Sequence, residues 1–335
     1  MIEHYDVAAL GELLIDFTEH GKSAQGNFMF EANPGGAPCN VLSMLSRLGY
    51  KTAFIGKVGQ DFFGQQLKET LKYQGIDERN VVFDTEVHTT LAMVHTLEDG
   101  DRDFSFYRNP GADMMLKKED IQTDILKNTR IFHFGTLSMT HPEVRDATKY
   151  AVEMAARYGA MISFDPNLRP PLWSSMEDAR EQVCYGLSKC QILKISDNEI
   201  QWFTGEEDFD EGVKAIRSQF DIPLILVSMG KDGSRAYYEG MVVEETSFLM
   251  EETIETTGAG DTFCACVLHY VLLHGLGGLT KSNIIEMLKF ANGAAALVTT
   301  RKGALKVMPE RREIEELLKG REVSGAGEGN ALHIL

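Results

Sequence analysis

Apolar and polar residues alternate along this chain with two different spacings. Short runs rich in β-branched and aromatic residues, each bounded by turn residues, predict strands. These runs are residues 52–55, 130–134, 160–164, 191–195 and 224–227. Longer segments between them, such as 142–158 and 174–190, have helical length. Strands that alternate with helices in this way predict an α/β fold, with a mostly parallel central sheet and helices on both faces.

Two segments depart from this pattern. Residues 16–33 and 89–109 are strand-like and carry aromatic side chains that we expect to face solvent. They predict a small β-sheet lobe beside the main domain, and a pair of surface hairpins is the alternative. The aromatic residues are Phe28, Phe30, Phe104, Phe106 and Tyr107. The last sixteen residues, 320–335, contain four glycines and little periodicity, which predicts a flexible tail after a domain of residues 1–319.

The charge of the chain limits its partners. It has 33 basic and 50 acidic side chains, a formal net charge of −17. Nucleic acid is therefore excluded as the default partner, and an anionic membrane surface is disfavoured, because both attract basic proteins. An anionic ligand such as a nucleotide would need local attraction from a helix N-terminus or a divalent cation.

The sequence also favours a cytoplasmic protein. Residues 1–6 contain no basic segment of the kind that begins a signal peptide. The longest apolar run, 263–279, includes His269 and His274 and is too short to span a membrane. Five scattered cysteines, an odd number, suit a reducing compartment better than a set of disulfides.

The most informative motif is residues 256–262, which lead into an apolar helix. Gly258 and Gly260 at the start of that helix let backbone amides approach a ligand closely, so an anion could bind there. Asp261 in the first turn could then orient or deprotonate an attacking hydroxyl during phosphoryl transfer. The alternative is an acidic residue that only complements the helix dipole. The chain has no Walker-type phosphate loop and no dinucleotide fingerprint after its first strand.

A second cluster, residues 33–40, precedes another predicted helix. Its adjacent glycines, Gly35 and Gly36, leave room for a polyhydroxylated ligand against the backbone, and Asn40 offers both a donor and an acceptor. Asp16 follows an apolar run and suits paired sugar hydroxyls. An ordinary loop and a solvated strand end are the alternatives for these positions.

Further polar residues follow the predicted strands. The segment 165–169 contains Arg169, whose guanidinium suits phosphate or carboxylate, and Arg108 could act in the same way. Other candidates at strand ends are Asp165, Ser196, Glu199, Ser228, Gly230 and Gly233. Each could simply belong to a turn. Because ligands of α/β sheets bind at the carboxyl ends of the strands, we expect these residues on one rim.

Taken together, these motifs resemble the PfkB, or ribokinase-like, carbohydrate kinases over residues 4–319. The glycine pair with Asn40, the stretch 56–64 and the motif 256–261 resemble the two signatures of that family. Residues 104–110, 165–173 and 194–197 are most similar to fructokinases. The resemblance implies a ribokinase-like fold whose small sheet, about 16–33 and 89–109, is a lid over the sugar.

The resemblance also implies roles for individual residues. Asp261 would be the catalytic base, and the amides of Gly258, Ala259 and Gly260 the anion hole. The sugar would contact Asp16, Gly35, Gly36, Asn40, Arg108, Asp165 and Arg169. The nucleotide would lie along Ser196, Ser228, Gly230, Gly233 and Asn292. Glu199 would serve Mg²⁺, and Glu255, Thr257 and the backbone near 299–304 would surround a monovalent cation, K⁺. The family often has Asn in place of Ser196 and Asp in place of Glu255.

The implied activity is transfer of the γ-phosphate of ATP, with Mg²⁺, to a hydroxyl of a small sugar, with fructose expected first. A 2-keto-3-deoxygluconate kinase is the nearest alternative, since Arg108 or Arg169 could bind its carboxylate. A non-catalytic sugar or nucleotide sensor on the same fold is the alternative from another class. The aromatic faces of the lid predict a homodimer in which two lids pack together.

Overall fold

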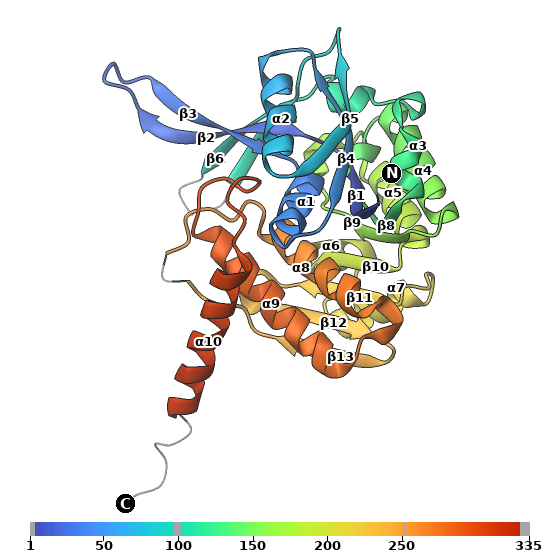
Figure 1. Cartoon of the computed structure of the whole chain (residues 1–335), viewed down its shortest axis with the longest axis vertical. Helices are drawn as coiled ribbons and strands as arrows, with labels where there is room; N and C mark the ends of the chain where they lie inside the picture. The colour runs from blue at the N-terminus through green and yellow to red at the C-terminus, as the bar shows by residue number, and fades with distance from the viewer. Residues whose placement is uncertain (1–3, 97–101, 251, 329–335) are drawn as a thin grey trace, which may run out of the picture.

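The computed structural model describes residues 4–96, 102–250 and 252–328 (Figure 1). Its main sheet has nine strands in the order β13-β12-β11-β10-β9-β8-β1-β4-β5. Their bounds are β1 (Tyr5–Leu10), β4 (Thr52–Gly59), β5 (Ile76–Asp84), β8 (Thr129–Gly135), β9 (Met161–Asp165), β10 (Ile192–Ser196), β11 (Leu224–Ser228), β12 (Ser234–Tyr238) and β13 (Met241–Glu245). The strands from β5 to β11 are parallel, and β12 and β13 add an antiparallel edge. This arrangement confirms the predicted α/β class.

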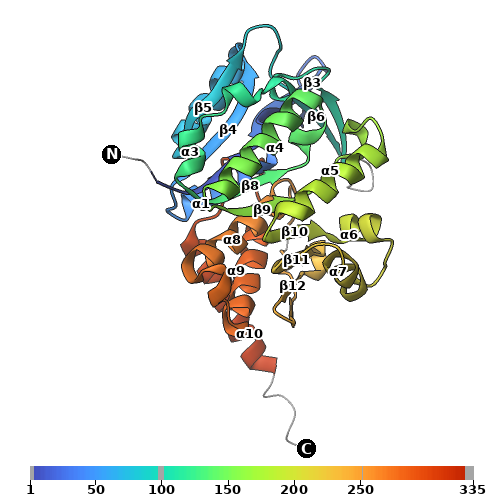
Figure 2. The same cartoon turned by 90° about the vertical axis from the view of Figure 1, so that its right-hand side faces the viewer.

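Helices cover both faces of this sheet (Figure 2). Residues of β1 alternate between two cores, with Val7 and Ala9 packed in one and Ala8 and Leu10 in the other. Such a strand is apolar throughout because both of its faces are buried. The first core includes residues of α1 (Ala37–Arg47), α2 (Phe62–Tyr73), α8 (Ala259–His274), α9 (Lys281–Thr299) and α10 (Arg311–Glu328). The second includes residues of α3 (Thr123–Lys127), α4 (Pro142–Arg157), α5 (Met176–Lys189), α6 (Asp197–Thr204) and α7 (Phe209–Arg217).

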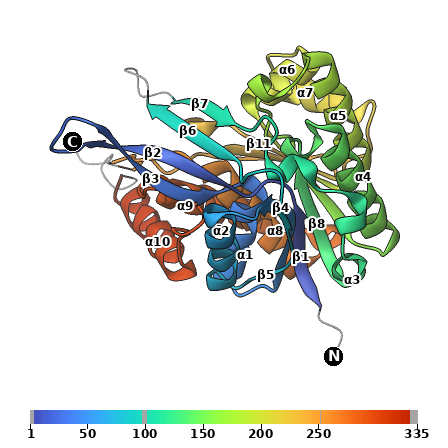
Figure 3. The same cartoon turned by 90° about the horizontal axis from the view of Figure 1, so that it is seen from above.

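A second sheet of four strands, in the order β3-β2-β6-β7, extends to one side of the main sheet (Figure 3). Its strands are β2 (Leu14–Lys22), β3 (Phe28–Gly35), β6 (Leu91–Thr96) and β7 (Arg102–Tyr107). Strands β2 and β6 pair in parallel, so the two segments that the sequence analysis set apart form one sheet. The prediction of a small β lobe, rather than two separate hairpins, is therefore confirmed.

Short 3-10 helices make up much of the remaining regular structure. They are η1 (Ala112–Met115), η2 (Lys118–Asp120), η3 (Leu137–Met139), η4 (Pro170–Leu172), η5 (Gly230–Asp232) and η6 (Leu276–Gly278). Several of them lie in loops after strands of the main sheet, η3 after β8, η4 after β9 and η5 after β11.

The predicted strand runs all fall on observed strands. Strands β1 and β5 and the hairpin β12–β13 are not among those runs. At the other end, α10 continues to Glu328, so the predicted tail from residue 320 begins within that helix. Residues 329–335 of that predicted tail lie outside the described residues. Within the described part of the chain, no helix is both long and apolar enough to cross a membrane.

A substitution of Phe164 would test how much packing in the second core stabilises the fold. Its ring is fully buried and lies 4.8 Å from that of Phe134, centroid to centroid. Helix α5 approaches it so closely that a Cβ on Gly186 would lie 2.3 Å from the ring. We expect Phe164→Ala to lower the free energy of unfolding by about 3–5 kcal/mol, since the cavity cannot collapse. Denaturant unfolding measures this, with Tyr73→Ala, at an 87% exposed position, as the control. A loss no larger than that of the control would contradict the packing argument.

Candidate active site

A cavity of about 330 Å³ opens where the two sheets meet. Its walls come from the segment between β1 and β2, the start of α1, strand β7, the segments after β8 and β9, strand β10 and the start of α8. The lining residues are Glu12, Leu14, Asp16, Gly36, Ala37, Asn40, Phe106, Leu137, Asn167, Arg169, Lys194, Thr256, Thr257, Gly258, Gly260 and Asp261. The structure thus brings the three candidate motifs of the sequence to one rim of the main sheet.

Asp261 lies in the first turn of α8 and is 9% exposed. The side-chain amide of Asn40 donates a hydrogen bond of 2.8 Å to its Oδ2. Burial raises the pKa of the Asp261 carboxyl, and the contact with Asn40 and the positive charges of Lys194 and Arg169 only partly oppose this. The carboxyl group is therefore fixed in direction and made more basic than an exposed aspartate, as a general base requires.

The start of α8 has room for a ligand because of its glycines. Gly258 has φ of 80°, and a Cβ there would lie 2.5 Å from the Cβ of Ala304, so only glycine fits. The N-terminus of this 16-residue helix also supplies partial positive charge. One of the three expected anion-hole amides is already engaged: the N–H of Ala259 donates to the carbonyl of Thr256 at 3.2 Å. The two glycines, but not Ala259, line the cavity.

Asp16, Gly35 and Gly36 form one compact corner of the site. A Cβ on Gly35 would lie 2.2 Å from Oδ2 of Asp16, and one on Gly36 would lie 2.3 Å from the carbonyl oxygen of Glu12. The glycine pair therefore allows β3 to pass close to the Asp16 carboxylate. Asp16 and Gly36 line the cavity, whereas Gly35 lies behind them.

Asp165 is not in the cavity wall, which differs from its expected contact with the sugar. It lines a smaller space of about 10 Å³ behind the cavity, together with His133. Its Oδ2 forms a buried ion pair with Nζ of Lys194 at 3.0 Å. Burial alone would lower the pKa of Lys194, but Asp165 and Glu199 outweigh it and raise the pKa, so the lysine stays charged. Asp165 thus holds a cation for the cavity instead of facing it.

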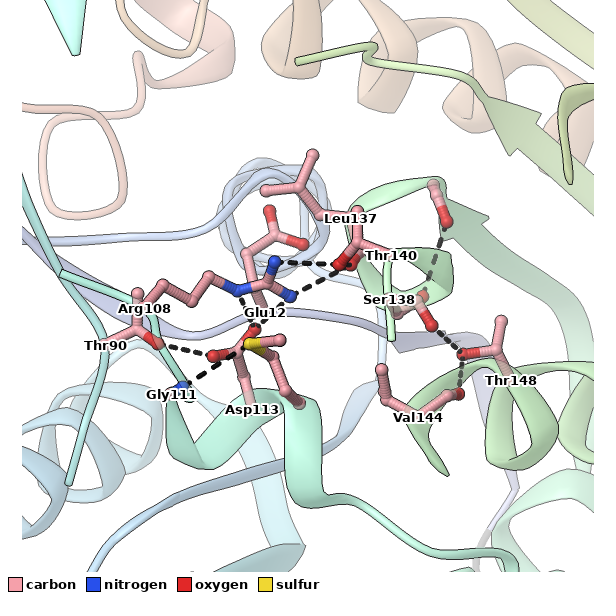
Figure 4. A network of polar contacts seen from close by, with 12 residues as sticks. Glu12, Thr90, Arg108, Gly111, Asp113, Leu137, Ser138, Thr140, Val144 and Thr148 are labelled. Atoms are coloured by element: carbon pink, nitrogen blue, oxygen red, sulfur yellow. Dashed lines mark hydrogen bonds and ion pairs between the residues drawn. The ribbon is translucent and has the colours of Figure 1, made fainter. Parts of the chain in front are cut away.

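Arg108 also differs from expectation. The resemblance implies that it reaches toward sugar or phosphate, but its guanidinium forms a buried ion pair with Asp113, at 2.7 Å from Nη2 to Oδ2. Figure 4 shows this pair among neighbouring polar groups. Arg108 is not among the residues that line the cavity, whereas Arg169 is.

A second cavity, of about 370 Å³, lies on the other side of the α8 N-terminus. Its wall includes Gly230 and Asn292, two of the expected nucleotide residues, together with Ala259. Thr256 lines both cavities, so the start of α8 separates them. The Asn292 side chain donates to the carbonyl of Glu245 at 3.0 Å and thereby fixes the end of β13 against α9.

Three further expected nucleotide residues lie near this cavity but not in its wall. Ser196 and Ser228 end the adjacent parallel strands β10 and β11 and stand opposite each other in the register. Gly233 has φ of 110°, and a Cβ there would lie 2.2 Å from the carbonyl oxygen of Glu245. Its role here is to allow the tight turn from η5 into β12.

Two of the three expected metal-site residues, Glu199 and Glu255, bind backbone amides. Glu199 accepts from the N–H of Leu168 at 2.7 Å and from that of Ser196 at 2.8 Å. Glu255 accepts from the N–H of Gly303 at 2.9 Å. Thr257 lines the first cavity. Across residues 4–96, 102–250 and 252–328, no group of three or more His, Cys, Asp or Glu side chains is arranged to hold a metal ion.

Sequence reasoning missed Glu12 and Lys194 as members of the site. Both are charged residues inside otherwise apolar runs, and this is the signal that could have revealed them. Glu12 is 4% exposed and lines the cavity. Its Oε1 accepts a hydrogen bond of 2.7 Å from the N–H of Ala37 at the start of α1. Burial raises the pKa of Glu12 to about 7.

Known proteins that are similar to this chain are carbohydrate kinases. Residues 5–311 match the model of the pfkB family carbohydrate kinases. The chain is 37% identical over 316 residues to a probable fructokinase-4 of Arabidopsis thaliana, covering 94% of this chain and 97% of that protein. A fructokinase of Xylella fastidiosa with bound ATP superposes with a TM-score of 0.86 at 28% identity, covering 95% of this chain and 99% of the other. A fructokinase of Vibrio cholerae O395 with bound fructose, ADP and calcium has a TM-score of 0.84 at 30% identity, covering 94% and 100%.

The chain therefore belongs to the pfkB family of carbohydrate kinases, with a ribokinase-like fold. It is a phosphotransferase that acts on a sugar hydroxyl.

Glu12 gives the site a measurable pH dependence. Folding raises the pKa of Glu12 from 4.5 to about 7, so the folded state favours the protonated carboxyl group. The contribution of Glu12 to the free energy of unfolding is therefore fully present below pH 4.5. It is lost as the pH rises from 4.5 to about 7, because the unfolded state ionises first. Glu12→Gln keeps an acceptor for Ala37 without the charge. We expect the variant to gain about 3 kcal/mol over the wild type at pH 8 and nothing at pH 4. Denaturant unfolding across this range, with the exposed Glu119→Gln as control, tests this. Parallel pH curves for wild type and Glu12→Gln would contradict it.

Proposed function

We propose that this protein phosphorylates fructose with ATP. The observation that supports this most directly is the position of Asp261, which Asn40 holds at the start of α8 between two cavities. The cavity on the Asn40 side has the polar groups for a sugar, and the cavity on the Asn292 side has the size for a nucleotide. The fructokinase relatives support fructose as the acceptor.

The reaction follows from these groups. Asp261 accepts the proton of the sugar hydroxyl as its oxygen attacks the γ-phosphorus of ATP, and the bond from that phosphorus to the oxygen of ADP breaks. The N-terminus of α8 stabilises negative charge on the transferring group, together with Lys194 and Arg169 in the same cavity. Alignment and charge stabilisation are the main requirements of phosphoryl transfer.

Mg²⁺ would enter with ATP and offset its charge, which an acidic protein needs. Glu199 is the proposed carboxylate for the water shell of Mg²⁺, and its bonds to two backbone amides orient it. For K⁺, the proposed donors are Glu255, Thr257 and carbonyl oxygens near 299–304. These segments fit such a site because the amides of Ile254 and Glu255 both donate to the carbonyl of Thr299, which brings the two segments together.

A sugar acid is the second candidate, and the charges of the site argue against it. Arg108 is paired with Asp113 and does not line the cavity. Lys194 and Arg169 would then have to serve both the carboxylate and the transferring phosphate. The carboxyl groups of Asp16 and Asp261 line the same cavity, and in their charged forms they would repel an acid.

The direct test is ADP release with purified protein, Mg²⁺ and K⁺ across fructose, 2-keto-3-deoxygluconate, ribose, glucose and adenosine. We expect the highest kcat/KM with fructose. A preference for the keto-acid would overturn fructose as the substrate while leaving the kinase mechanism. Binding of sugar or ATP without any ADP release would indicate a sensor.

Asp261→Asn tests the proposed base. The amide keeps the shape of the side chain but cannot take up the proton, so we expect kcat to fall by about 10²–10⁴-fold. Binding of ATP, measured by calorimetry, should change little. Asp124→Asn is the matched control, since Asp124 also stands in the first turn of a helix but is exposed. Near-normal turnover of Asp261→Asn would rule out this role.

We also propose a homodimer through the small sheet. Phe28, Met29 and Phe30 on β3 are 60%, 41% and 37% exposed, and a second copy would cover them. We expect a dimeric mass in sedimentation at micromolar concentration, shifted toward the monomer by Phe28→Ser but not by Tyr73→Ser. A monomeric mass for the wild type would exclude this assembly.

A further inference from the structure

Arg108 and Asp113 form the most buried ion pair at the junction of the two sheets. Both side chains are 2% exposed. Arg108 directly follows β7, the strand of the small sheet that contributes Phe106 to the cavity wall. Nε and Nη2 of its guanidinium both donate to Oδ2 of Asp113, at 2.8 and 2.7 Å. Asp113 lies in η1, within the part of the chain that follows the small sheet.

The other oxygen of Asp113 holds the second strand at the same end of the hairpin. Its Oδ1 accepts a hydrogen bond from the hydroxyl of Thr90, which directly precedes β6 and is 1% exposed. Gly111 permits this close approach, because a Cβ there would lie 1.8 Å from the Thr90 hydroxyl. One carboxylate therefore fixes both places where the β6–β7 hairpin leaves the main body.

The remaining donors of Arg108 reach the segment that follows β8 (Figure 4). Nη1 donates to the hydroxyl of Thr140 at 2.8 Å, and Nη2 donates to the carbonyl of Leu137 at 3.0 Å. Leu137 lies in η3 and lines the cavity, as Phe106 does. The cluster of Thr90, Arg108, Asp113, Leu137 and Thr140 thus joins the end of β7, two residues after the wall residue Phe106, to the wall residue Leu137 in η3.

We propose that this cluster is the anchor of the small sheet, and that Arg108 is a positioning residue and not a ligand of the sugar. Through Asp113 and Leu137, Arg108 sets the distance between the two walls that enclose the acceptor hydroxyl. The effect of this anchor on catalysis rests on the proposed kinase function. The structural part of the proposal, the fixed base of the β6–β7 hairpin, does not depend on the identity of the sugar.

Loosening the anchor should admit water to the reaction. Removing one partner of a buried ion pair leaves the other charge without compensation, so the base of the hairpin must rearrange. Water then replaces the sugar hydroxyl as the group that attacks the γ-phosphorus, and the products are ADP and inorganic phosphate. The ratio of free phosphate to sugar phosphate therefore reports the position of the small sheet.

The test compares Arg108→Met, Asp113→Asn and the double variant. We expect amide hydrogen exchange in peptides covering 91–94 and 105–107 to become about 10-fold faster in each single variant, with β8 and β9 unchanged. The fraction of ADP formed without sugar phosphate should rise, and KM for the sugar should rise more than kcat falls. The double variant should show smaller changes than either single variant, because it leaves no unpaired buried charge, and this non-additivity identifies two residues that share one contact. Arg235→Met is the control, since Arg235 on β12 pairs with Asp210 and Glu244, away from the anchor.

Two further variants keep the test decisive. Arg108→Lys retains the charge but not the planar fork, so it should show a smaller effect than Arg108→Met. Thr90→Val removes only the hydroxyl contact and should speed exchange in β6 more than in β7, even if the charge variants fold poorly.

The proposal is overturned if Arg108→Met raises KM for the sugar while Asp113→Asn leaves it unchanged, the pattern of a direct ligand. Unchanged hydrogen exchange in all the variants would overturn it as well. Absence of turnover with any sugar in the wild type would instead reject the proposed function, and the hydrogen exchange result would still decide the anchor.

Discussion

Pairing of buried charge is the constraint on which this site depends. The carboxyl ends of the parallel strands lie inside the molecule, where an unpaired ion would be strongly destabilising. Each charged group there has a specific partner: Lys194 has Asp165, Arg108 has Asp113, and Glu255 has the amide of Gly303. These pairs belong to different loops, so satisfying them also fixes the loops relative to one another. The geometry of the cavity is a consequence of this pairing.

The same constraint explains how a chain with a net charge of −17 can bind a polyanion. The overall field repels ATP, so attraction has to be local and short in range. The N-terminus of α8 supplies it without adding a full charge, and Lys194 supplies a cation that Asp165 keeps protonated. Without the carboxylates of Asp165 and Glu199, burial would lower the pKa of this lysine. The ion pair behind the cavity is therefore what makes the cation in front of it available.

The sequence predicted the parts of this protein that rest on local pattern. Apolar runs and glycines located the parallel strands and the three motifs, because period and backbone freedom are local properties. It did not predict where long side chains point. Arg108 and Asp165 lie where the pattern places them, yet the charged group of Arg108 turns to Asp113 in η1, and that of Asp165 turns to Lys194 on another strand. Nor did the pattern identify Glu12, whose role depends on the amide of Ala37, 25 residues away.

The partners of the buried Asp261 carboxyl group also determine how strong a base it is. A base works best when its pKa lies near the pH of the reaction, and burial moves that of Asp261 upward. Complete burial without partners would leave the group protonated and inactive. Asn40, Lys194 and Arg169 favour its charged form and so limit the rise. Two of these, Lys194 and Arg169, also line the cavity, where the negative charge of a transferring phosphate would draw on the same cations. As ATP occupies them, they stabilise the Asp261 carboxylate less, and its affinity for the sugar proton increases. Nucleotide binding would in this way strengthen the base at the moment it is needed.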